Sequence, residues 1–486
     1  MKTRVIIFLS LLTYSQLGCK KFIEIEGPTT SVNSLNVYKQ DATAASVLTG
    51  VYTKLSSGSL LGTERTSSLY YLAGLSSDEL SIVSGYGSPQ MDAYYSNSLT
   101  STTFGFGIWN DIYTQLYTIN AALEGVTESN TLTPSVKKQL LGEAKFMRAF
   151  YFFYLVNLYG DIPLVTNTDY RTNSLITRAP KAQVWNQIIS DLKDAESLLS
   201  INYLGASLVN ITQERLRPTK AAAVALLARS YLYIKEWKLA EEQAVKLIGD
   251  SNYELVTLEN VFLKNSKEVI WQLQPTTKGL NTPEALSFVI DPNLGFNGTP
   301  AVLSNSLMEA FDSGDQRKVN WIGQVEISGT NYYYAYKYKK VNRTGNLDFP
   351  VDEYSTVFRL AEQYLILAEA QIQQNKIVEG ITTLNTLRDR ARDKTANFDT
   401  QLKLLTINLT KEEALLAVEH EFRTEFFTEW GHRWLNLKRT GRVDAVMNIE
   451  APKKSIGGIW HSYQQWYPIE FRQLQANPEL IQNSGY

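Results

Sequence analysis

The chain has 486 residues, of which 44% are hydrophobic and 12% aromatic, with 28 Tyr, 9 Trp and 14 Pro. This is the composition of a globular protein long enough to bury one or two sizeable cores. The formal net charge is −2. Nucleic-acid binding normally requires a basic patch, so we expect no nucleic-acid partner.

The N-terminus has the pattern of a secretory signal peptide. Lys2 and Arg4 precede an apolar run at 5–12, which is too short to span a bilayer comfortably. Cys19 is the only cysteine, so no disulfide can form within the chain. It lies where a signal peptidase would cut, and the segment resembles a bacterial lipobox with Gln16 in place of the usual aliphatic residue. The alternative is an ordinary secreted protein with a stray cysteine.

Cleavage before Cys19 would remove residues 1–18 and change the formal charge from −2 to −4. Lipidation of Cys19 would attach the protein to a membrane, because each buried CH₂ of an acyl chain contributes about 0.8 kcal/mol. No later stretch has transmembrane length, so the lipid would be the only anchor. Residues 19–34 are predicted to form a tether.

Helical periodicity predicts helices over much of the mature chain. Apolar residues recur at three- and four-residue steps near 47–55, at 106–125, 134–159 and 185–199. Residues 56–103, in contrast, are rich in Ser, Gly and Tyr and show no helical period. We expect a long irregular insertion there, of a kind that often carries binding function.

Two later segments read as pairs of short helices. They cover 218–248 and 359–391, and each alternates small with large residues. Helix pairs of about this length resemble tetratricopeptide units, whose period is about 34 residues. Because the two segments are not contiguous, we predict a helical-repeat scaffold interrupted by insertions.

The largest insertion is predicted at 250–358. Alternation over 332–338 indicates a strand, and Ser328-Gly329-Thr330-Asn331 indicates a turn before it. Its tyrosines, with Trp321, Asn297 and Arg343 nearby, could stack on ring-shaped ligands and bond their hydroxyl groups. The alternative is a tyrosine-rich hairpin packed on the helices, since Tyr is a favoured strand residue.

The stretch 410–441 combines charged and aromatic side chains at helical spacing. Thr410 and Glu413 have the spacing of a capping box, and an aromatic and aliphatic stripe runs toward a break at Gly431. We predict ion pairs between residues four apart, which are Glu419 with Arg423 and Glu429 with Arg433.

Two interpretations of this stretch compete. Its histidines and glutamates could be metal ligands or acid/base groups, although HEFRTE is not the H-E-x-x-H motif. Alternatively, the helix is an ion-paired structural element in the core, which we favour. The residues concerned are His420, Glu421, Glu425 and His432.

Several segments together resemble one family, the SusD/RagB lipoproteins of the Bacteroidetes outer membrane. They are the lipobox cysteine with KKFIEI, then GEAKFMRAFYFFYLVNLYGDIPLV, RLAEQYLILAEA, TLNTLRDRA, EFFTEWGHRWLNLKRTG and the terminal YPIEFRQLQANPELIQNSGY. Their order and spacing make the match specific. Departures from the family pattern are small and fall at Asn436, Glu470 and Ser484.

The resemblance implies a mainly α fold: a single domain at 35–486, in which a tetratricopeptide-like scaffold carries irregular, partly β insertions near 56–103 and 250–358. It also implies a cell-surface nutrient-binding lipoprotein, acting as the lid of a SusC-like TonB-dependent transporter. The ligand would be a glycan or sometimes a peptide, bound without bond chemistry, and we assign no cofactor and no metal-ligating residue.

The family has no fixed ligand motif, so we select candidate contacts from the two insertions. They are Tyr86, Tyr94, Tyr95 and Asn97 in the first, and Trp321, Tyr332, Tyr333 and Tyr334 in the second.

Two other functions stay open from the sequence. A tetratricopeptide adaptor would bind protein. A helical glycoside hydrolase would need two carboxyl groups about 5–10 Å apart across a cleft. Candidate acids in the insertions are Asp78, Glu79, Asp291, Asp312 and Asp315. The sequence contains no G-x-S-x-G, Walker or G-x-G-x-x-G motif.

Overall fold

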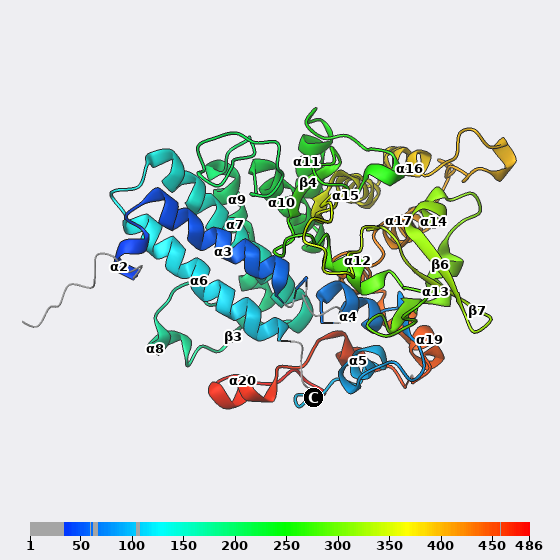
Figure 1. Cartoon of the computed structure of the whole chain (residues 1–486), viewed down its shortest axis with the longest axis horizontal. Coiled ribbons are helices and arrows are strands. Elements are labelled where there is room, and N and C mark those ends of the chain that lie inside the picture. Colours follow the sequence, from blue (N-terminus) through cyan, green and yellow to red (C-terminus); the bar gives the residue numbers. More distant parts are fainter. Residues whose placement is uncertain (1–33, 59, 62–66, 104–106, 457) are drawn as a thin grey trace, which may run out of the picture.

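The computed structural model describes residues 34–58, 60–61, 67–103, 107–456 and 458–486, and most of this chain is helical (Figure 1). The expected signal peptide, Cys19 and nearly all of the expected tether lie outside the described residues. Among the helices that are described, none combines the length and apolar character needed to cross a membrane.

Eight long helices form an array in which each packs against the next along the chain. This array is the mainly α scaffold that the periodicity predicted. Its members are α3 (Asp41–Ser57), α6 (Ile108–Glu128), α7 (Pro134–Tyr159), α9 (Lys181–Leu198), α10 (Lys220–Tyr233), α11 (Trp237–Ile248), α15 (Leu360–Gln373) and α16 (Ile377–Arg390).

The two predicted helix pairs are confirmed, and they stack on each other. α10 packs on α11, α15 packs on α16, and α11 lies against α15 across more than a hundred intervening residues. Each pair is joined by a turn with one residue in the left-handed region, Lys235 (φ 64°) in the first and Asn375 (φ 65°) in the second. The interrupted repeat therefore becomes continuous in space.

Helix α7 has the bounds that the sequence predicted. Pro134 occupies its first turn, where the missing N–H is no loss, and Gly160 ends it with φ 80°. Residues 146–156 are all buried, and the helix packs against both α6 and α9. It is the central helix of the largest core cluster.

The expectation that 56–103 lacks helices is wrong. α4 (Leu69–Ser76) is a helix buried along its whole length, and α5 (Pro89–Tyr95) is a second short one. A helix buried on all sides has no polar face, so LYYLAGLS carries no three- or four-residue period to detect.

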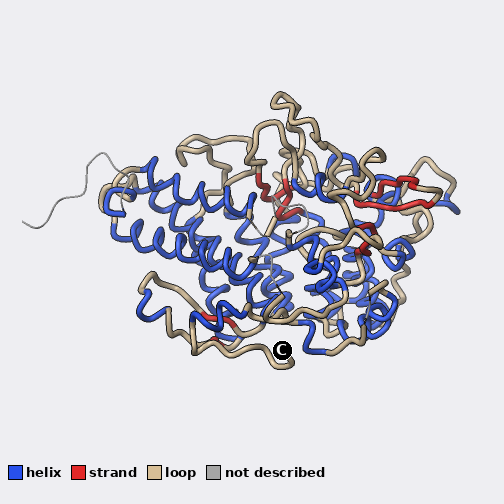
Figure 2. The backbone as a smooth tube through the Cα atoms, turned by 60° about the horizontal axis from the view of Figure 1, so that its bottom comes forward, coloured by secondary structure: helices blue, strands red, loops and turns tan. Residues whose placement is uncertain are grey.

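The strands are short and occur only in pairs among the described residues (Figure 2). The antiparallel pairs are β1 (Leu80–Ile82) with β5 (Ala301–Leu303), β2 (Ile162–Pro163) with β3 (Arg178–Ala179), β4 (Val269–Leu273) with β8 (Ser355–Arg359), and β6 (Ile322–Ile327) with β7 (Thr330–Ala335). The remaining helices are α2 (Ser34–Val37), α8 (Tyr170–Asn173), α12 (Pro283–Phe288), α13 (Asn305–Ala310), α14 (Gln316–Trp321), α17 (Lys411–Glu425), α18 (His432–Arg439), α19 (Val443–Glu450) and α20 (Phe471–Ala476).

The predicted tyrosine-rich strand and the turn before it are present in the β6–β7 hairpin, but β7 covers Thr330–Ala335, so Thr330 and Asn331 belong to the strand and 336–338 lie beyond it. Ser328 and Gly329 form its two-residue turn, with φ 53° and 78°, as expected for the tight turns that suit twisted hairpins.

The capping box of α17 and the break before α18 are also confirmed. Thr410 and Glu413 cap each other's backbone N–H, and Gly431 separates the helices with φ 70°. α17 closes a second core cluster with α15 and α16.

Candidate ligand-binding face

A short β-ladder joins the two insertions that the sequence analysis singled out. Leu80 pairs with Leu303 and Ile82 with Ala301, and the next backbone bond runs from Val83 N–H to Pro300 O (2.9 Å). Segments more than 200 residues apart therefore lie side by side. β5 contacts β7 and is followed by α13, both labelled in Figure 1, and we call the surroundings of this ladder the candidate face.

One part of this face is a cluster of tyrosines around Phe296, which we call the tyrosine surface. Tyr86 lies edge-on to Phe296 (5.2 Å between ring centroids), and Tyr332 packs edge-on to Phe296 as well (4.7 Å). Tyr334 follows on the same side of β7, with Tyr336 next to it (5.9 Å). Tyr86 is 44% exposed, while Tyr332, Tyr334 and Tyr336 are half-buried. Such rings offer flat apolar faces and hydroxyl groups to a ligand.

Strand alternation decides which tyrosines of β7 belong to this surface. Tyr332 and Tyr334 pack with Phe296 and Val325, whereas Tyr333 points to the other side and packs against the main core. Gly323 is the cross-strand partner of Tyr334, and the Tyr334 ring covers it. A Cβ at Gly323 would overlap the ring atoms, so glycine sets the position of Tyr334.

A polar cavity of about 350 Å³ lies beside the other end of β1. Its lining combines the Tyr95 side chain with three serine hydroxyls, one amide, three carboxylates and two amines. A mixture of fixed donors and acceptors with one aromatic ring suits a polyhydroxyl ligand. The residues that line it are Asp78, Leu80, Ser81, Tyr95, Ser304, Asn305, Ser306, Glu309, Glu450, Lys453 and Lys454.

The charged groups of this cavity are held by further contacts. Asp78 accepts two bonds from Arg433 (2.7 and 2.8 Å), and Arg423 lies 2.8 Å from it. Burial alone would raise the pKa of Asp78, but the two arginines outweigh it and hold that pKa well below its usual value. Lys454 donates to Leu75 O (2.7 Å) and lies over the Tyr95 ring.

Four of the predicted contact residues are buried, and of these only Tyr95 (3% exposed) also lines the polar cavity. Trp321 is 0% exposed and donates from Nε1 to Leu258 O (3.0 Å). Tyr94 is buried edge-on against Tyr467 (5.2 Å). Asn97 is also buried and donates to Ser76 O (2.9 Å). We leave the other three out of the proposed ligand contacts, together with Tyr333.

The face also contains groups that the sequence analysis did not select as contacts. Phe296 supports the tyrosine surface, and its segment, GFNGTP, gave no period. Tyr336 continued the alternation of β7 and could have been included. Lys454 lies far along the chain in a segment without a distinctive pattern, so only the fold reveals it.

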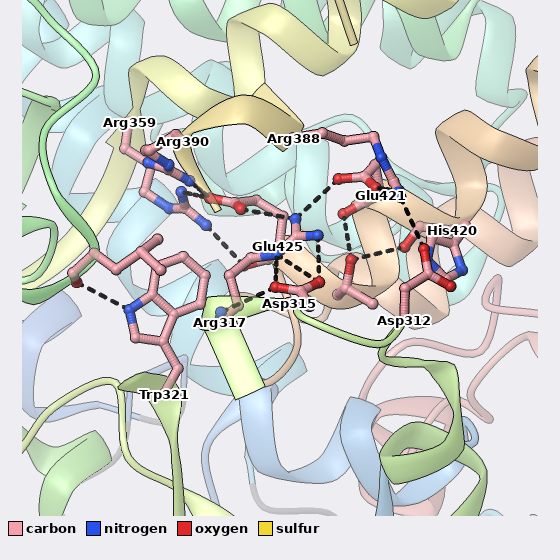
Figure 3. A network of polar contacts seen from close by, with 12 residues as sticks. Asp312, Asp315, Arg317, Trp321, Arg359, Arg388, Arg390, His420, Glu421 and Glu425 are labelled. Atoms are coloured by element: carbon pink, nitrogen blue, oxygen red, sulfur yellow. Dashed lines mark hydrogen bonds and ion pairs between the residues drawn. The ribbon is translucent and has the colours of Figure 1, made fainter. Parts of the chain in front are cut away.

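The competing stretch at 410–441 forms a buried ion network (Figure 3). Glu425 accepts from Arg317 (3.2 Å), Arg359 (2.6 Å) and Arg390, and Glu421 accepts from Arg317 (2.9 Å) and Arg388. These arginines occupy the carboxylate oxygens that a metal or an acid/base mechanism would use.

His432 belongs to the same core. It packs against Phe426 (4.6 Å between centroids), and burial, followed by the field of nearby arginines, holds its pKa well below the usual value. The predicted pairs between residues four apart are corrected: Arg433 and Arg423 both bind Asp78, while Glu429 binds Arg359 and Lys337.

Three of the candidate hydrolase acids, Asp78, Asp312 and Asp315, are paired with arginines. Asp315 is buried against Arg317 (2.7 Å) and Asp312 binds Arg388 (2.9 Å). Glu79 is buried, and burial, reinforced by Asp78, raises its pKa to about 8. Asp291 lies 4.0 Å from Arg343.

Two family models match the chain. Residues 34–232 match a SusD-like family described as starch-binding and associating with the outer membrane, and residues 289–486 match the SusD family. SusD-like protein P25 of Formosa agariphila is 23% identical over the full length of both chains. SusD-like protein P38 of the same organism is 24% identical over 99% of this chain and 98% of its own.

Solved structures show the same fold. A SusD superfamily protein from Bacteroides vulgatus has a TM-score of 0.77 at 21% identity, over 92% of this chain and 100% of its own. A laminarin-binding SusD-like protein has a TM-score of 0.73 at 21% identity, with the same coverage. Surface glycan-binding protein A from Bacteroides uniformis has a TM-score of 0.74 at 18% identity, over 91% and 99%. The two family matches, with relatives aligned from end to end, show that this chain belongs to the SusD/RagB family.

Proposed function

We propose that this protein binds an oligosaccharide on the tyrosine surface and in the adjacent polar cavity. The observation that carries the proposal is the exposed ring of Tyr86, grouped with Tyr332 and Tyr334 on one face. Structures of the same fold include proteins described as laminarin-binding and surface glycan-binding. Flat aromatic faces beside fixed hydroxyl, amide and carboxylate groups are what sugar rings require.

The proposal includes a cell-surface location and a transport partner. Cys19 would carry the lipid, and the domain would act as a lid over a SusC-like TonB-dependent transporter, as the family resemblance implies. The ligand would bias the closed state of the lid because it contacts that state more extensively. The protein itself would break no bond, which agrees with the pairing of Asp78, Asp312 and Asp315 with arginines.

Replacing Tyr86 and Tyr332 together by Ala is expected to weaken glycan binding by at least about tenfold, since each stacked ring contributes roughly 0.5–1.5 kcal/mol beyond its buried area. The measurement is calorimetric titration of the soluble mature domain, with Cys19 removed, against glycans found by screening a glycan and peptide panel.

Tyr117→Ala is the matched control, because Tyr117 is 58% exposed on α6, outside the tyrosine surface. It should bind as the unaltered protein does. Selection of peptides alone from the panel would overturn the glycan proposal, and sugar release from a polysaccharide would favour the hydrolase.

Gly323→Ala is a separate test of the tyrosine surface. The added methyl group would displace the Tyr334 ring from its place across the hairpin. We expect glycan affinity to fall by a factor of about three to ten, equivalent to roughly 1 kcal/mol, in the same titration. Gly50→Ala, at an open position of α3, should leave affinity unchanged; equal affinities of both variants would remove Tyr334 from the site.

A further inference from the structure

A cavity lies within the helical scaffold, and its lining contains no residue of the two insertions. It has a volume of about 650 Å³, within the range of small-molecule sites. One wall is the turn between α10 and α11, with Leu232 and Trp237. The opposite wall is α17, with Leu415, Leu416 and Phe422.

A buried ion pair forms the base of this cavity. Arg439 donates to both carboxylate oxygens of Glu369 (2.6 Å each), and its guanidinium lies near the rings of Tyr233 (5.3 Å) and Phe422 (5.6 Å). Arg439 Nε also donates to Asn436 Oδ1 (2.6 Å), which fixes the orientation of the amide. Asn436 Nδ2 is then left buried, with no acceptor in the described structure. Such a donor normally has a partner.

The lining has four cationic side chains, Lys235, Lys411, Arg439 and Arg442, against three carboxylates, Glu369, Glu412 and Glu419, so its formal charge is +1. Glu369 is neutralised by Arg439, and Glu419 is bound by both Arg433 (3.0 Å) and Arg442 (3.1 Å). Within the described part of the chain, Lys411 donates only to neutral oxygens, Gln373 O (2.8 Å) and Asn375 Oδ1 (3.3 Å). Lys235 forms no ion pair with any described residue. The polar end of an occupant should therefore accept hydrogen bonds and carry negative charge.

The uncharged part of the lining has three polar residues, Gln373, Asn436 and Thr440, and five apolar ones. Three leucines with Phe422 and Trp237 favour an apolar body, whereas a sugar needs convergent polar groups around its ring. We propose that this cavity is a second binding site, which takes a small amphipathic carboxylate: the apolar body lies between α17 and the α10–α11 turn, and the carboxylate faces Lys235 and Lys411. This site is independent of the proposed glycan site.

The test uses 4-phenylbutyrate and its uncharged analogue 4-phenylbutanamide as probes for calorimetric titration of the mature domain. The carboxylate should bind, and the amide should bind at least about tenfold more weakly, a difference of about 1.4 kcal/mol. Failure of 4-phenylbutyrate to bind in the millimolar range, or equal binding of the two probes, would overturn the proposal. Both titrations use the unaltered protein, so neither result depends on whether a variant folds.

A pair of matched variants locates the site. Leu416 and Leu404 are each 44% exposed, but only Leu416 lines the cavity. Leu416→Glu places a carboxylate beside the ligand and should weaken 4-phenylbutyrate binding at least about tenfold, whereas Leu404→Glu should stay within about twofold. Unchanged binding to Leu416→Glu would overturn the assignment to this cavity. Glycan affinity should be the same in both variants, which separates this result from the proposed function.

Discussion

Glu425→Ala is expected to lower the free energy of unfolding by about 3–5 kcal/mol, because it breaks a buried ion network from its centre. The Glu425 side chain is fully buried and accepts from three arginines, Arg317, Arg359 and Arg390 (Figure 3). Without it, three buried guanidinium groups lose a shared counter-ion. The free energy is measured by urea denaturation followed by circular dichroism.

The destabilisation caused by Glu425→Ala should depend on pH, because the pKa of Glu425 differs between the folded and unfolded states. Burial alone would raise the pKa of Glu425, but Arg390 and Arg359 outweigh it and hold the pKa well below its usual value. A depressed carboxyl pKa stabilises the folded state above the unfolded pKa, about 4.3, and that contribution is lost as the pH falls below it. The difference in unfolding free energy between the original protein and Glu425→Ala should therefore narrow between neutral and acidic pH.

Glu242→Ala is the matched control for this experiment. Glu242 is an exposed residue in the middle of α11, where replacement by Ala should change the unfolding free energy by about 0.5 kcal/mol or less. If Glu425→Ala were as stable as Glu242→Ala, the network would not hold the scaffold together.

Local signals predicted the helices well because they act within one turn. Pro134 and Gly160 determine the ends of α7, and Thr410 with Glu413 starts α17, whatever the rest of the chain does. The turn at Ser328-Gly329 is likewise a local preference. α4 was missed because burial on every side removes the polar face that periodicity requires.

The partners of charged side chains could not be predicted, because they come from distant segments. Arg433 lies four residues from Glu429, yet it binds Asp78, 355 residues away, while Glu429 binds Arg359. The same limit applies to the candidate site. Tyr86 and Trp321 are both aromatic residues in predicted insertions. Tyr86 is exposed and packs against Phe296, whereas Trp321 is buried in the core.

Arg433→Ala is expected to lower the free energy of unfolding by about 3 kcal/mol, the lower end of the range for breaking a buried ion pair. Its side chain is buried and holds Asp78 through two bonds and Glu419 through a third (3.0 Å). Asp78 would keep only Arg423 as a partner. The melting temperature and the urea midpoint should both fall.

Arg442→Ala is the control that separates the effect of burial from the loss of an arginine, because Arg442 binds the same Glu419 but its side chain is exposed. Exposed ion pairs contribute about 0–1 kcal/mol to stability, so the melting temperature of this variant should be close to that of the original protein.

Because Asp78 also lines the polar cavity, glycan titration of Arg433→Ala distinguishes the two interpretations of the 410–441 stretch. A lower melting temperature supports a structural role, whereas an unchanged melting temperature with lost binding would make Arg433 part of the ligand site.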